Sequence, residues 1–340
     1  MSDRLKGKVA IVTGSGQGIG RAIALAMAKE GAKLVTNNRR PGSTKLISRD
    51  PFMEKLNEEQ KKFALAEEAK LIGDAETTAK TIRDMGGEAV PFFGDVADYE
   101  TAGNLIKTAV DKFGKVDILV NNAGNYHMCP IWEMTEAIWY RLLNAHVNGT
   151  WNCVRQAVGL MKDQKWGRII NCSSVSRFGM KYHSNYSASK GAIVSFTRAI
   201  AKDLWEFGIT VNAYAPGAYT RAGASSAMHA LVYSKTTQTA RAERLRSMMA
   251  GQSGEEGRSP EMLAPFIAYL ATQEAANISG SVFGVHGNHI GLYSEPTEIA
   301  VLDKEKGLWT VDELIKQAPK VLFKGYKSKA PSSEIGGGEG

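Results

Sequence analysis

The stretch that decides the fold is "KVAIVTGSGQGIGRA", from Lys8 to Ala22. It opens with an unbroken apolar run, typical of a strand buried on both faces, and continues through a glycine-rich turn into an apolar helical pattern. The segment from Thr13 to Gly20 matches TGxxxGxG without exception. Glycine is needed where the backbone turns tightly and approaches a pyrophosphate, and the N-terminus of the following helix favours that negative charge. The stretch therefore predicts a dinucleotide-binding strand, turn and helix.

Strand and helix patterns alternate along the rest of the chain. Further strands are expected at 32–38, 88–96, 116–124, 167–174, 208–217 and 280–287. Helices are expected at 75–87, 101–114, about 136–161 and 186–207. Because the strands are apolar throughout and separated by helices, they predict an α/β fold. The expected architecture is a Rossmann-type, doubly wound parallel sheet of about seven strands, with helices on both faces.

The alternation predicts one domain over residues 1–294. Two segments stand outside it: a charged helical insertion at about 41–72 and a substrate lid at about 218–258. One apolar stripe is available on the inserted helix: Phe52, Leu56, Phe63 and Leu71. Residues 295–340 are expected to form a C-terminal extension with a short helix capped by Thr310, and its last residues to be disordered.

Composition and charge exclude several classes of function. The chain has 340 residues, 43% hydrophobic and 23% charged, which is ordinary for a globular protein. The net charge is +7, but the basic residues are interspersed, so nucleic-acid binding is not predicted. Three separated cysteines without a CxxC pair, and a "HGNH" segment without acidic neighbours, indicate neither disulfides nor a metal site. Without a signal peptide or a membrane-length apolar run, a cytoplasmic protein that does not bind membranes is expected.

The end of the second strand bears on the choice of dinucleotide. An NAD site usually places an acid there to bond the ribose 2′-hydroxyl, whereas this strand ends "TNNRR", with Asn38 followed by Arg39 and Arg40. A carboxylate would repel a 2′-phosphate, and a guanidinium would hold it. NADP(H) is therefore preferred as the cofactor. NAD(H) stays the alternative, because solvated arginines at the start of the insertion would show the same pattern.

Tyr186 and Lys190, in "SNYSASKGA", are four residues apart in a predicted helix and so share one face. A tyrosine ordinarily loses its proton near pH ~10, and a neighbouring ammonium favours the phenolate and lowers that pKa. Tyr186 could then exchange a proton with an alcohol or a carbonyl near neutral pH. The same spacing also arises by chance on helix surfaces, so its meaning depends on the motifs around it.

Those motifs occur in one order and at consistent spacing: "TGSGQGIG" at 13–20, Asp95 after the third strand, "NNAG" at 121–124, "NCSS" at 171–174, "YSASK" at 186–190 and "PG" at 216–217. The set resembles the short-chain dehydrogenase/reductase family, and the resemblance covers roughly residues 5–290. The TGxxxGxG form differs from the TGxxGxxG pattern of the extended branch of that family. The resemblance implies an enzyme that interconverts alcohols and ketones with a nicotinamide cofactor.

The resemblance also implies a role for each matching residue. Tyr186 is the general acid/base, Lys190 lowers its pKa and bonds the nicotinamide ribose, and a serine at the end of the fifth strand bonds the substrate oxygen. Ser174 is preferred because it directly precedes Val175, although Ser173 has the usual spacing to the tyrosine, so both stay open. The other implied cofactor contacts are Gly14, Ser15, Gln17, Gly18, Ile19, Gly20, Asn38, Arg39, Asp95, Val96, Asn122, Ala123, Gly124, Pro216, Gly217 and Thr220.

One position departs from the family pattern. The fourth catalytic residue of the family is an Asn in the central helix, whose main-chain carbonyl holds a water next to the lysine, and here His146 stands at that position. Its backbone could hold the same water and its imidazole could pass protons, unless it is only a packed helix residue. A His here, and "APGAYTR", resemble the 3-hydroxyacyl-CoA dehydrogenase units of peroxisomal multifunctional enzymes. That subgroup is NAD-dependent and carries an acid where this chain has Asn38.

Bulky side chains follow the strand ends and favour a large apolar or ring substrate: Tyr126, Met128, Trp132, Phe178, Met180 and Tyr182. The leading prediction is a ketoreductase or alcohol dehydrogenase for a 3-hydroxyacyl-CoA/3-oxoacyl or other CoA-thioester substrate. The alternatives are a hydroxysteroid or cyclic-alcohol dehydrogenase and, in another class, a non-catalytic dinucleotide-binding regulator. The family also implies a homodimer or homotetramer.

Overall fold

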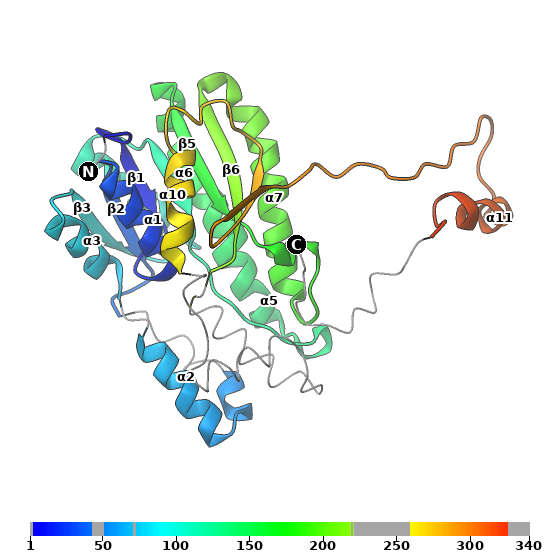
Figure 1. Cartoon of the computed structure of the whole chain (residues 1–340), viewed down its shortest axis with the longest axis horizontal. Helices are drawn as coiled ribbons and strands as arrows, with labels where there is room; N and C mark the ends of the chain where they lie inside the picture. The colour runs from blue at the N-terminus through cyan, green and yellow to red at the C-terminus, as the bar shows by residue number, and fades with distance from the viewer. Residues whose placement is uncertain (1–2, 43–50, 71–72, 219, 221–258, 326–340) are drawn as a thin grey trace.

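The computed structural model describes residues 3–42, 51–70, 73–218, 220 and 259–325. Eight strands form one sheet in the order β3-β2-β1-β4-β5-β6-β7-β8 (Figure 1). They are β1 (Val9–Val12), β2 (Lys33–Asn38), β3 (Ala89–Phe93), β4 (Ile118–Asn121), β5 (Gly167–Cys172), β6 (Ile209–Pro216), β7 (Val282–His286) and β8 (His289–Leu292). The first seven pair in parallel, and the order reverses at β1 and β4. The predicted doubly wound α/β fold is confirmed, and this reversal is where such sheets bind ligands.

The eighth strand was not predicted. β8 runs antiparallel to β7, and His286 pairs with His289 across a two-residue turn in which Gly287 has φ +52°. β8 has only four residues, and its Ile290 and Leu292 are 54% and 67% exposed. It therefore lacks the buried apolar pattern by which the other strands are recognised in the sequence. The sheet therefore has one antiparallel edge strand on an otherwise parallel sheet, as in many doubly wound folds.

Helices cover both faces of the sheet (Figure 1). On one face lie α1 (Gly18–Lys29), α3 (Ala75–Asp84) and α10 (Pro260–Leu270), and on the other α4 (Tyr99–Phe113), α6 (Gly149–Gln164) and α7 (Ser184–Leu204). β1 illustrates the partition, because Ala10 and Val12 join the first apolar cluster while Val9 and Ile11 join the second. Side chains of a strand alternate between faces, so a strand covered on both faces must be apolar throughout.

The long central helix changes its winding in the middle. It begins as α5 (Glu136–Leu143), passes through a π-helical turn at Asn144–Asn148, and continues as α6. The sequence predicted one uninterrupted helix over this stretch, because a π turn leaves the helical pattern intact on either side. His146 lies inside the turn and is 3% exposed. Turns of this kind often occur at functional sites.

The insertion between β2 and α3 contains two helical pieces. A 3-10 turn spans Pro51–Lys55, and α2 spans Glu58–Lys70, so the single inserted helix that we expected is interrupted near Leu56. Leu56 is 5% exposed, which is consistent with its place in the predicted apolar stripe. Lys55 Nζ lies 3.3 Å from the carboxylate of Glu133, which connects the insertion to the 3-10 turn Ile131–Glu133.

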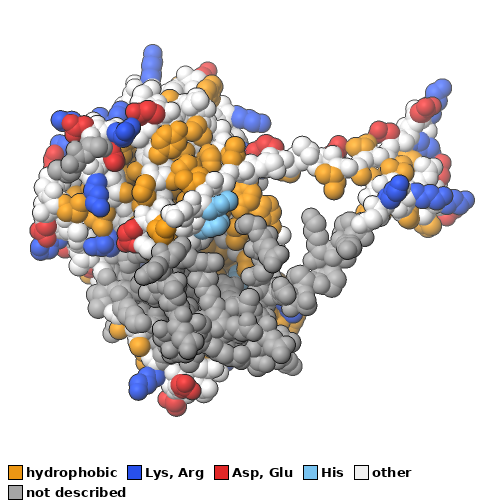
Figure 2. All heavy atoms as spheres, in the orientation of Figure 1, with side chains coloured by type: hydrophobic (Ala, Val, Ile, Leu, Met, Phe, Trp, Pro, Cys, Tyr) orange, Lys and Arg blue, Asp and Glu red, His pale blue; other side chains and the backbone are white. Residues whose placement is uncertain are grey.

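The C-terminal extension leaves the sheet after β8 and ends in a separate helix, α11 (Val311–Val321), which stands away from the body (Figure 1). Thr310 caps it as predicted, in a reciprocal capping box with Glu313. Figure 2 shows apolar side chains on the surface of this helix. Its exposed apolar residues include Val311 (72% exposed) and Ile315 (66%). Most of the predicted lid, and the last residues from 326 on, lie outside the described residues. No described helix is both long and apolar enough to span a membrane.

Candidate active site

The glycine turn between β1 and α1 is built around close backbone contacts. Gly14 has φ +63°, and a Cβ placed on it would lie 2.8 Å from Cα of Ala123. Gly18 also has a positive φ, +55°, and a Cβ on Gly20 would lie 2.4 Å from the carbonyl oxygen of Gly14. Real Cβ atoms do not approach backbone so closely, so glycine is required at both 14 and 20. The turn thus presents bare backbone at the carboxyl end of β1.

Asn37 at the end of β2 holds this turn, although the sequence drew attention only to its neighbour. Its Oδ1 accepts a hydrogen bond from Gly14 N (3.3 Å), its Nδ2 donates to Gly94 O (3.1 Å), and its backbone pairs with Ser15. The hydroxyl of Ser15, which we expected at the cofactor, accepts from Asn37 N (2.9 Å) and is fully buried. Ser15 therefore joins β1 to β2 through its side chain.

Asn122 holds the other side of the turn. Its Nδ2 donates to the carbonyl oxygens of Thr13 (3.1 Å) and Gly14 (3.3 Å), and its Oδ1 accepts from the hydroxyl of Tyr214 (3.0 Å). The Thr13 hydroxyl in turn accepts from the backbone N–H groups of Asn122 and Ala123. These bonds join the ends of β1, β4 and β6. Gly124 packs against His146, because a Cβ there would lie 2.5 Å from Cε1 of that ring.

The start of α1 fits a dinucleotide pyrophosphate. Gln17 occupies the N-cap without a side-chain capping bond, and instead donates to the carbonyl of Gly73 (3.1 Å). The first turn of the helix contains no acidic residue. The N–H groups and the positive end of the helix dipole are therefore not neutralised by the side chains of that turn, as an anion site requires. Ile19 is partly buried and packs against the core.

At the end of β2, two residues flank Gly16. A Cβ on Gly16 would overlap Oδ1 of Asn38 and lie 2.6 Å from Cα of Asp74. The Asn38 Oδ1 is buried and has no hydrogen-bond partner in the structure, and Arg39 next to it is exposed. Asp74 was not identified from the sequence. It follows the insertion, caps α3, and accepts hydrogen bonds from Thr77 N (3.0 Å) and Gly42 N (3.3 Å).

The remaining predicted cofactor residues lie at the carboxyl ends of β3 and β6. Asn152 of α6 fixes the turn after β3 by donating to the carbonyls of Val96 (2.9 Å) and Ala97 (3.0 Å), next to the exposed Asp95. Pro216 ends β6, and Gly217 N donates to Val285 O (2.8 Å). Thr220 lies over the glycine turn, since its Cγ2 is 3.7 Å from a Cβ built on Gly18. The fold therefore collects residues from both halves of the chain at one edge of the sheet.

Tyr186 and Lys190 lie in the first two turns of α7, at the carboxyl end of β5. Lys190 is 3% exposed, its Nζ donates to the carbonyl oxygen of Cys172 (2.7 Å), and it lies 5.6 Å from the centre of the Tyr186 ring. Burial lowers the pKa of the Lys190 ammonium, an effect that nearby Cys172 partly offsets. The predicted pair is thus brought together, with its cation anchored on the strand end.

The two candidate serines face different surroundings. The Ser173 hydroxyl is fully buried and donates to the carbonyl oxygen of Lys190 (2.9 Å), which attaches α7 to the end of β5. Ser174 precedes the 3-10 turn Val175–Phe178, and its hydroxyl accepts from Ser176 N (3.1 Å). The Ser174 hydroxyl also donates to that of Ser176 (3.2 Å), so its partners lie within the loop after the strand, whereas Ser173 bonds the backbone of a helix.

His146 is packed edge-on against Tyr186, with the ring centres 5.5 Å apart. Its Nε2 lies 2.8 Å from the carbonyl oxygen of Asn125, and its Nδ1 is buried with no hydrogen-bond partner in the structure. Burial, reinforced by the positive charge of Lys190, holds the pKa of His146 well below its ordinary value. His146 is therefore neutral at pH 7. Asn125 N also lies 3.3 Å from Nε2, but the shorter contact of Nε2 is to a carbonyl, which can only accept, so Nε2 carries the proton and Nδ1 is left as an acceptor.

This neutral imidazole predicts a pH dependence of folding stability. Below pH ~6.5 His146 binds a proton in the unfolded chain but not in the folded one. The free energy of unfolding therefore falls by up to about 1.4 kcal/mol per pH unit as the pH decreases. Urea unfolding between pH 7.5 and about 5 measures this for the wild type and for His146→Asn. As the pH falls, the free energy of unfolding should decrease more for the wild type than for the variant. The exposed His289→Asn is the control, and its curve should follow that of the wild type. Parallel curves for wild type and His146→Asn would contradict a neutral buried ring.

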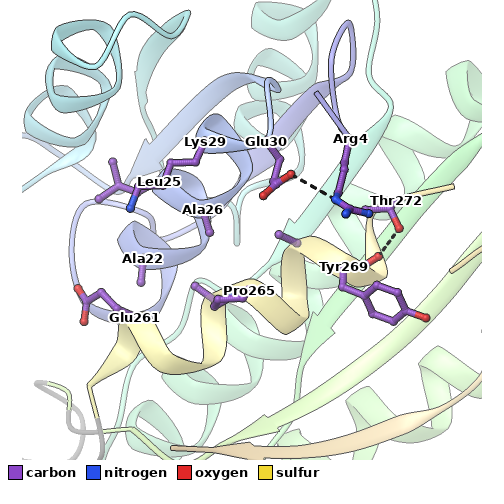
Figure 3. Close-up of a pocket in the computed structure, with 12 residues that line it drawn as sticks. Arg4, Ala22, Leu25, Ala26, Lys29, Glu30, Glu261, Pro265, Tyr269 and Thr272 are labelled. Atoms are coloured by element: carbon purple, nitrogen blue, oxygen red, sulfur yellow. Dashed lines mark hydrogen bonds and ion pairs between the residues drawn. The ribbon is translucent and has the colours of Figure 1, made fainter. Parts of the chain in front are cut away.

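A separate cavity of about 400 Å³ lies between α1 and α10 (Figure 3). Small side chains of α1 such as Ala22 and Ala26 line it, together with Arg4 and Glu30. None of the site residues described above lines it. This cavity is therefore distinct from the candidate active site at the carboxyl edge of the sheet.

Comparison with known proteins agrees with this geometry. The family model described as short chain dehydrogenase matches residues 8–63 and 51–229. A 3-oxoacyl-[acyl-carrier-protein] reductase of Synechocystis is 33% identical over 289 residues, covering 84% of this chain and 98% of that protein. A peroxisomal hydratase-dehydrogenase-epimerase of Neurospora crassa is 37% identical over 216 residues, covering 63% of this chain and 20% of that protein. A solved short chain dehydrogenase from Mycobacterium avium has a TM-score of 0.71 at 29% identity, covering 94% of this chain and 96% of that one.

The glycine turn, the Tyr186–Lys190 pair and these matches over most of the chain lead to one conclusion. The chain belongs to the short-chain dehydrogenase/reductase family, whose members are oxidoreductases that bind NAD(P)(H) and act on small molecules.

Proposed function

We propose that the protein interconverts a secondary alcohol and a ketone, with NADP(H) as the preferred cofactor and a 3-hydroxyacyl or 3-oxoacyl thioester as the substrate. The observation that carries this proposal is the position of the Tyr186 phenol beside the buried Lys190 ammonium, at the sheet edge that also holds the glycine turn. A phenol next to a cation is suited to proton transfer with an alcohol oxygen near neutral pH.

Each residue has a role in this reaction. During reduction Tyr186 donates its proton to the substrate oxygen, and during oxidation it takes that proton back. Lys190 favours the phenolate that remains, and the Ser174 hydroxyl donates a hydrogen bond to the same substrate oxygen. A nicotinamide cofactor, held by the glycine turn and by Lys190, would supply or accept the hydride in this reaction. His146, with its unpartnered Nδ1, supports a route that resupplies protons to Lys190 through water.

The preference for NADP(H) is supported by Arg39 and by the neutral side chain of Asn38. An exposed guanidinium next to the end of β2 is suited to a ribose 2′-phosphate, and Asn38 contributes no charge to repel it. Asp74 brings a carboxylate to the same corner, but two backbone N–H groups already bind that carboxylate. Arg39 is therefore the group at this corner on which the preference for the phosphorylated cofactor rests.

The thioester substrate is supported by the relatives. The Synechocystis relative is named as a reductase of 3-oxoacyl groups on acyl carrier protein, in which the acyl group is bound as a thioester. The central experiment follows nicotinamide absorbance on a panel of 3-oxoacyl thioesters, cyclic ketones and steroid ketones, each with NADPH and with NADH. We expect the highest kcat/KM for a 3-oxoacyl thioester with NADPH. Turnover of steroid or cyclic ketones alone would show that the substrate is not a thioester and would favour a hydroxysteroid or cyclic-alcohol dehydrogenase. No turnover at all would favour a non-catalytic regulator.

Replacing Arg39 by alanine tests the cofactor. A guanidinium–phosphate hydrogen bond contributes about 1.5–3 kcal/mol, so the Kd for NADPH should rise roughly 10- to 100-fold while the Kd for NADH stays the same. Calorimetric titration of both cofactors measures this directly. The exposed Arg4, near the separate cavity, provides the control, and Arg4→Ala should bind both cofactors as the wild type does. Equal weakening of both cofactors, or none, would argue for NAD(H).

A further inference from the structure

A second tyrosine and a histidine meet beside Tyr186. Tyr126 lies in the loop after β4, and His183 is the residue directly before α7. The ring of Tyr126 lies edge-on to that of Tyr186, with centres 5.3 Å apart, and the centres of the His183 and Tyr186 rings are 6.4 Å apart. The Tyr126 hydroxyl is hydrogen-bonded to Nε2 of His183. Neither residue belongs to the set whose roles follow from the family pattern.

The direction of that hydrogen bond follows from the other nitrogen of the ring. His183 Nδ1 lies 2.6 Å from the carbonyl oxygen of Lys181, and a carbonyl can only accept, so Nδ1 carries a proton. In a neutral imidazole Nε2 then has none, and it accepts the proton of the Tyr126 hydroxyl. His183 is 1% exposed, so its ring is held in place by packing. The Tyr126 oxygen is thereby oriented as a hydrogen-bond acceptor.

The backbone keeps the two loops in this arrangement. Cys129 N donates to the carbonyl of Tyr182 (3.1 Å), which joins the loop of Tyr126 to the residue before His183. Tyr182 has φ +65°, a conformation that is uncommon for a residue other than glycine. Such strained residues concentrate at functional sites, where the surrounding structure holds them. Two separate loops are thus joined next to the phenol that performs the proton transfer.

We infer that Tyr126, oriented by His183, accepts a hydrogen bond from a donor group of the substrate that lies a few bonds from the reacting carbon. This inference rests on the alcohol–ketone chemistry proposed above, and it adds a specificity-determining contact to it. Two kinds of substrate carry such a donor: a pantetheine thioester, whose first amide N–H lies beyond the thioester sulfur, and a hydroxyketone, whose hydroxyl lies near the carbonyl. His183 is a positioning residue, because it acts only by fixing the Tyr126 hydroxyl.

Two matched ligand pairs separate these sources. The first pair is the acetoacetyl thioester of N-acetylcysteamine and its N-methyl analogue, which lacks the N–H. The second pair is a β-hydroxyketone whose hydroxyl is tertiary, and therefore cannot be oxidised, and its O-methyl ether. Binding is measured by calorimetry on protein saturated with the oxidised cofactor, which cannot reduce a ketone. Because a neutral hydrogen bond contributes about 0.5–1.5 kcal/mol, the wild type should bind the donor member of one pair roughly 3- to 10-fold more tightly.

The variants show whether Tyr126 is responsible. Tyr126→Phe should lose the preference for the donor ligand, as should His183→Leu. His183→Gln should retain most of the preference, because its amide oxygen can still accept from the phenol. Tyr269→Phe, an exposed tyrosine on α10, is the control and should retain the whole preference. A tyrosine with only a structural role would change the binding of both members of a pair equally.

The outcomes separate this inference from the proposed function. A preference within either ligand pair that disappears in Tyr126→Phe supports the inference and identifies the donor as N–H or O–H. A preference that survives in Tyr126→Phe, or a wild type that distinguishes neither pair, overturns it. If the preference is found but the reduced cofactor reduces no ketone, the contact stands and the proposed reaction is rejected.

Discussion

Tyr186→Phe is expected to lower kcat by roughly 10²–10⁴-fold while the protein binds NADPH as the wild type does. The substitution removes one oxygen and with it the proton that the substrate oxygen must gain or lose. The phenyl ring keeps the edge-on packing against His146 and Tyr126. Stopped-flow or steady-state absorbance gives kcat, and fluorescence titration of NADPH gives the affinity in the same preparation.

The control for this substitution is Tyr140→Phe, which removes the same atom from a tyrosine that is 51% exposed on α5. Its kcat should stay within about twofold of the wild type, since surface substitutions usually change stability by less than about 0.5 kcal/mol. An active Tyr186→Phe protein would remove the basis of the proposed mechanism. A protein without turnover whose biological activity is unchanged by Tyr186→Phe would instead be a dinucleotide-binding regulator.

The second large effect is expected at Gly14. An alanine there must adopt φ near +63°, which costs about 1 kcal/mol, and its Cβ would lie 2.8 Å from Cα of Ala123. Neither the Cβ nor Cα of Ala123 can rotate away from the other, so relief requires the β1 and β4 ends to separate, at a further cost of about 1–3 kcal/mol. Gly14→Ala should therefore unfold about 2–4 kcal/mol more easily in urea. It should also bind NADPH at least about tenfold more weakly, because the displaced backbone no longer reaches the pyrophosphate.

Gly159→Ala is the matched control for that change. Gly159 lies on the exposed side of α6, and a Cβ there would meet nothing within 4 Å. The same replacement should then stabilise the protein by about 0.5–1 kcal/mol, because alanine has the higher helix propensity. NADPH titration should give the wild-type affinity for this variant. A Gly14→Ala protein as stable and as tightly bound to NADPH as the wild type would contradict the close approach of the two strand ends.

The predictable parts of the molecule were those with a local signal. The glycine turn combines a residue type, a spacing and a flanking strand, and parallel strands bring their carboxyl ends to one edge wherever they occur in the chain. For that reason Tyr186, Ser174 and the glycines could be assigned to one region without coordinates. β8 could not, because its four residues are mostly exposed and their apolar content is not periodic.

Contacts between distant segments were beyond the reach of the sequence. Asn37 looks like any polar residue before an arginine pair, and only the structure reveals that its amide joins the turn after β1 to the end of β3. Asp74 reaches Gly16 because the insertion returns the chain to the same corner, which no spacing rule predicts. The partnership of Tyr126 with His183 likewise depends on two loops 57 positions apart.

The π turn at Asn144–Asn148 lets one continuous helix place His146 in the site and the apolar stripe of α6 in the core, two positions that regular winding would not allow together. Removing a single residue from an ordinary α-helix rotates everything beyond it by about 100°, which would swing an apolar stripe out of the core. Here the wider turn absorbs one residue, so Cys153, Ala157 and Met161 stay in the interior while the His146 ring packs against Tyr186. Shortening this turn by one residue should restore regular winding and turn the imidazole away from Tyr186. The helix would still form, but it could no longer place His146 in the site and the apolar residues of α6 in the core at the same time.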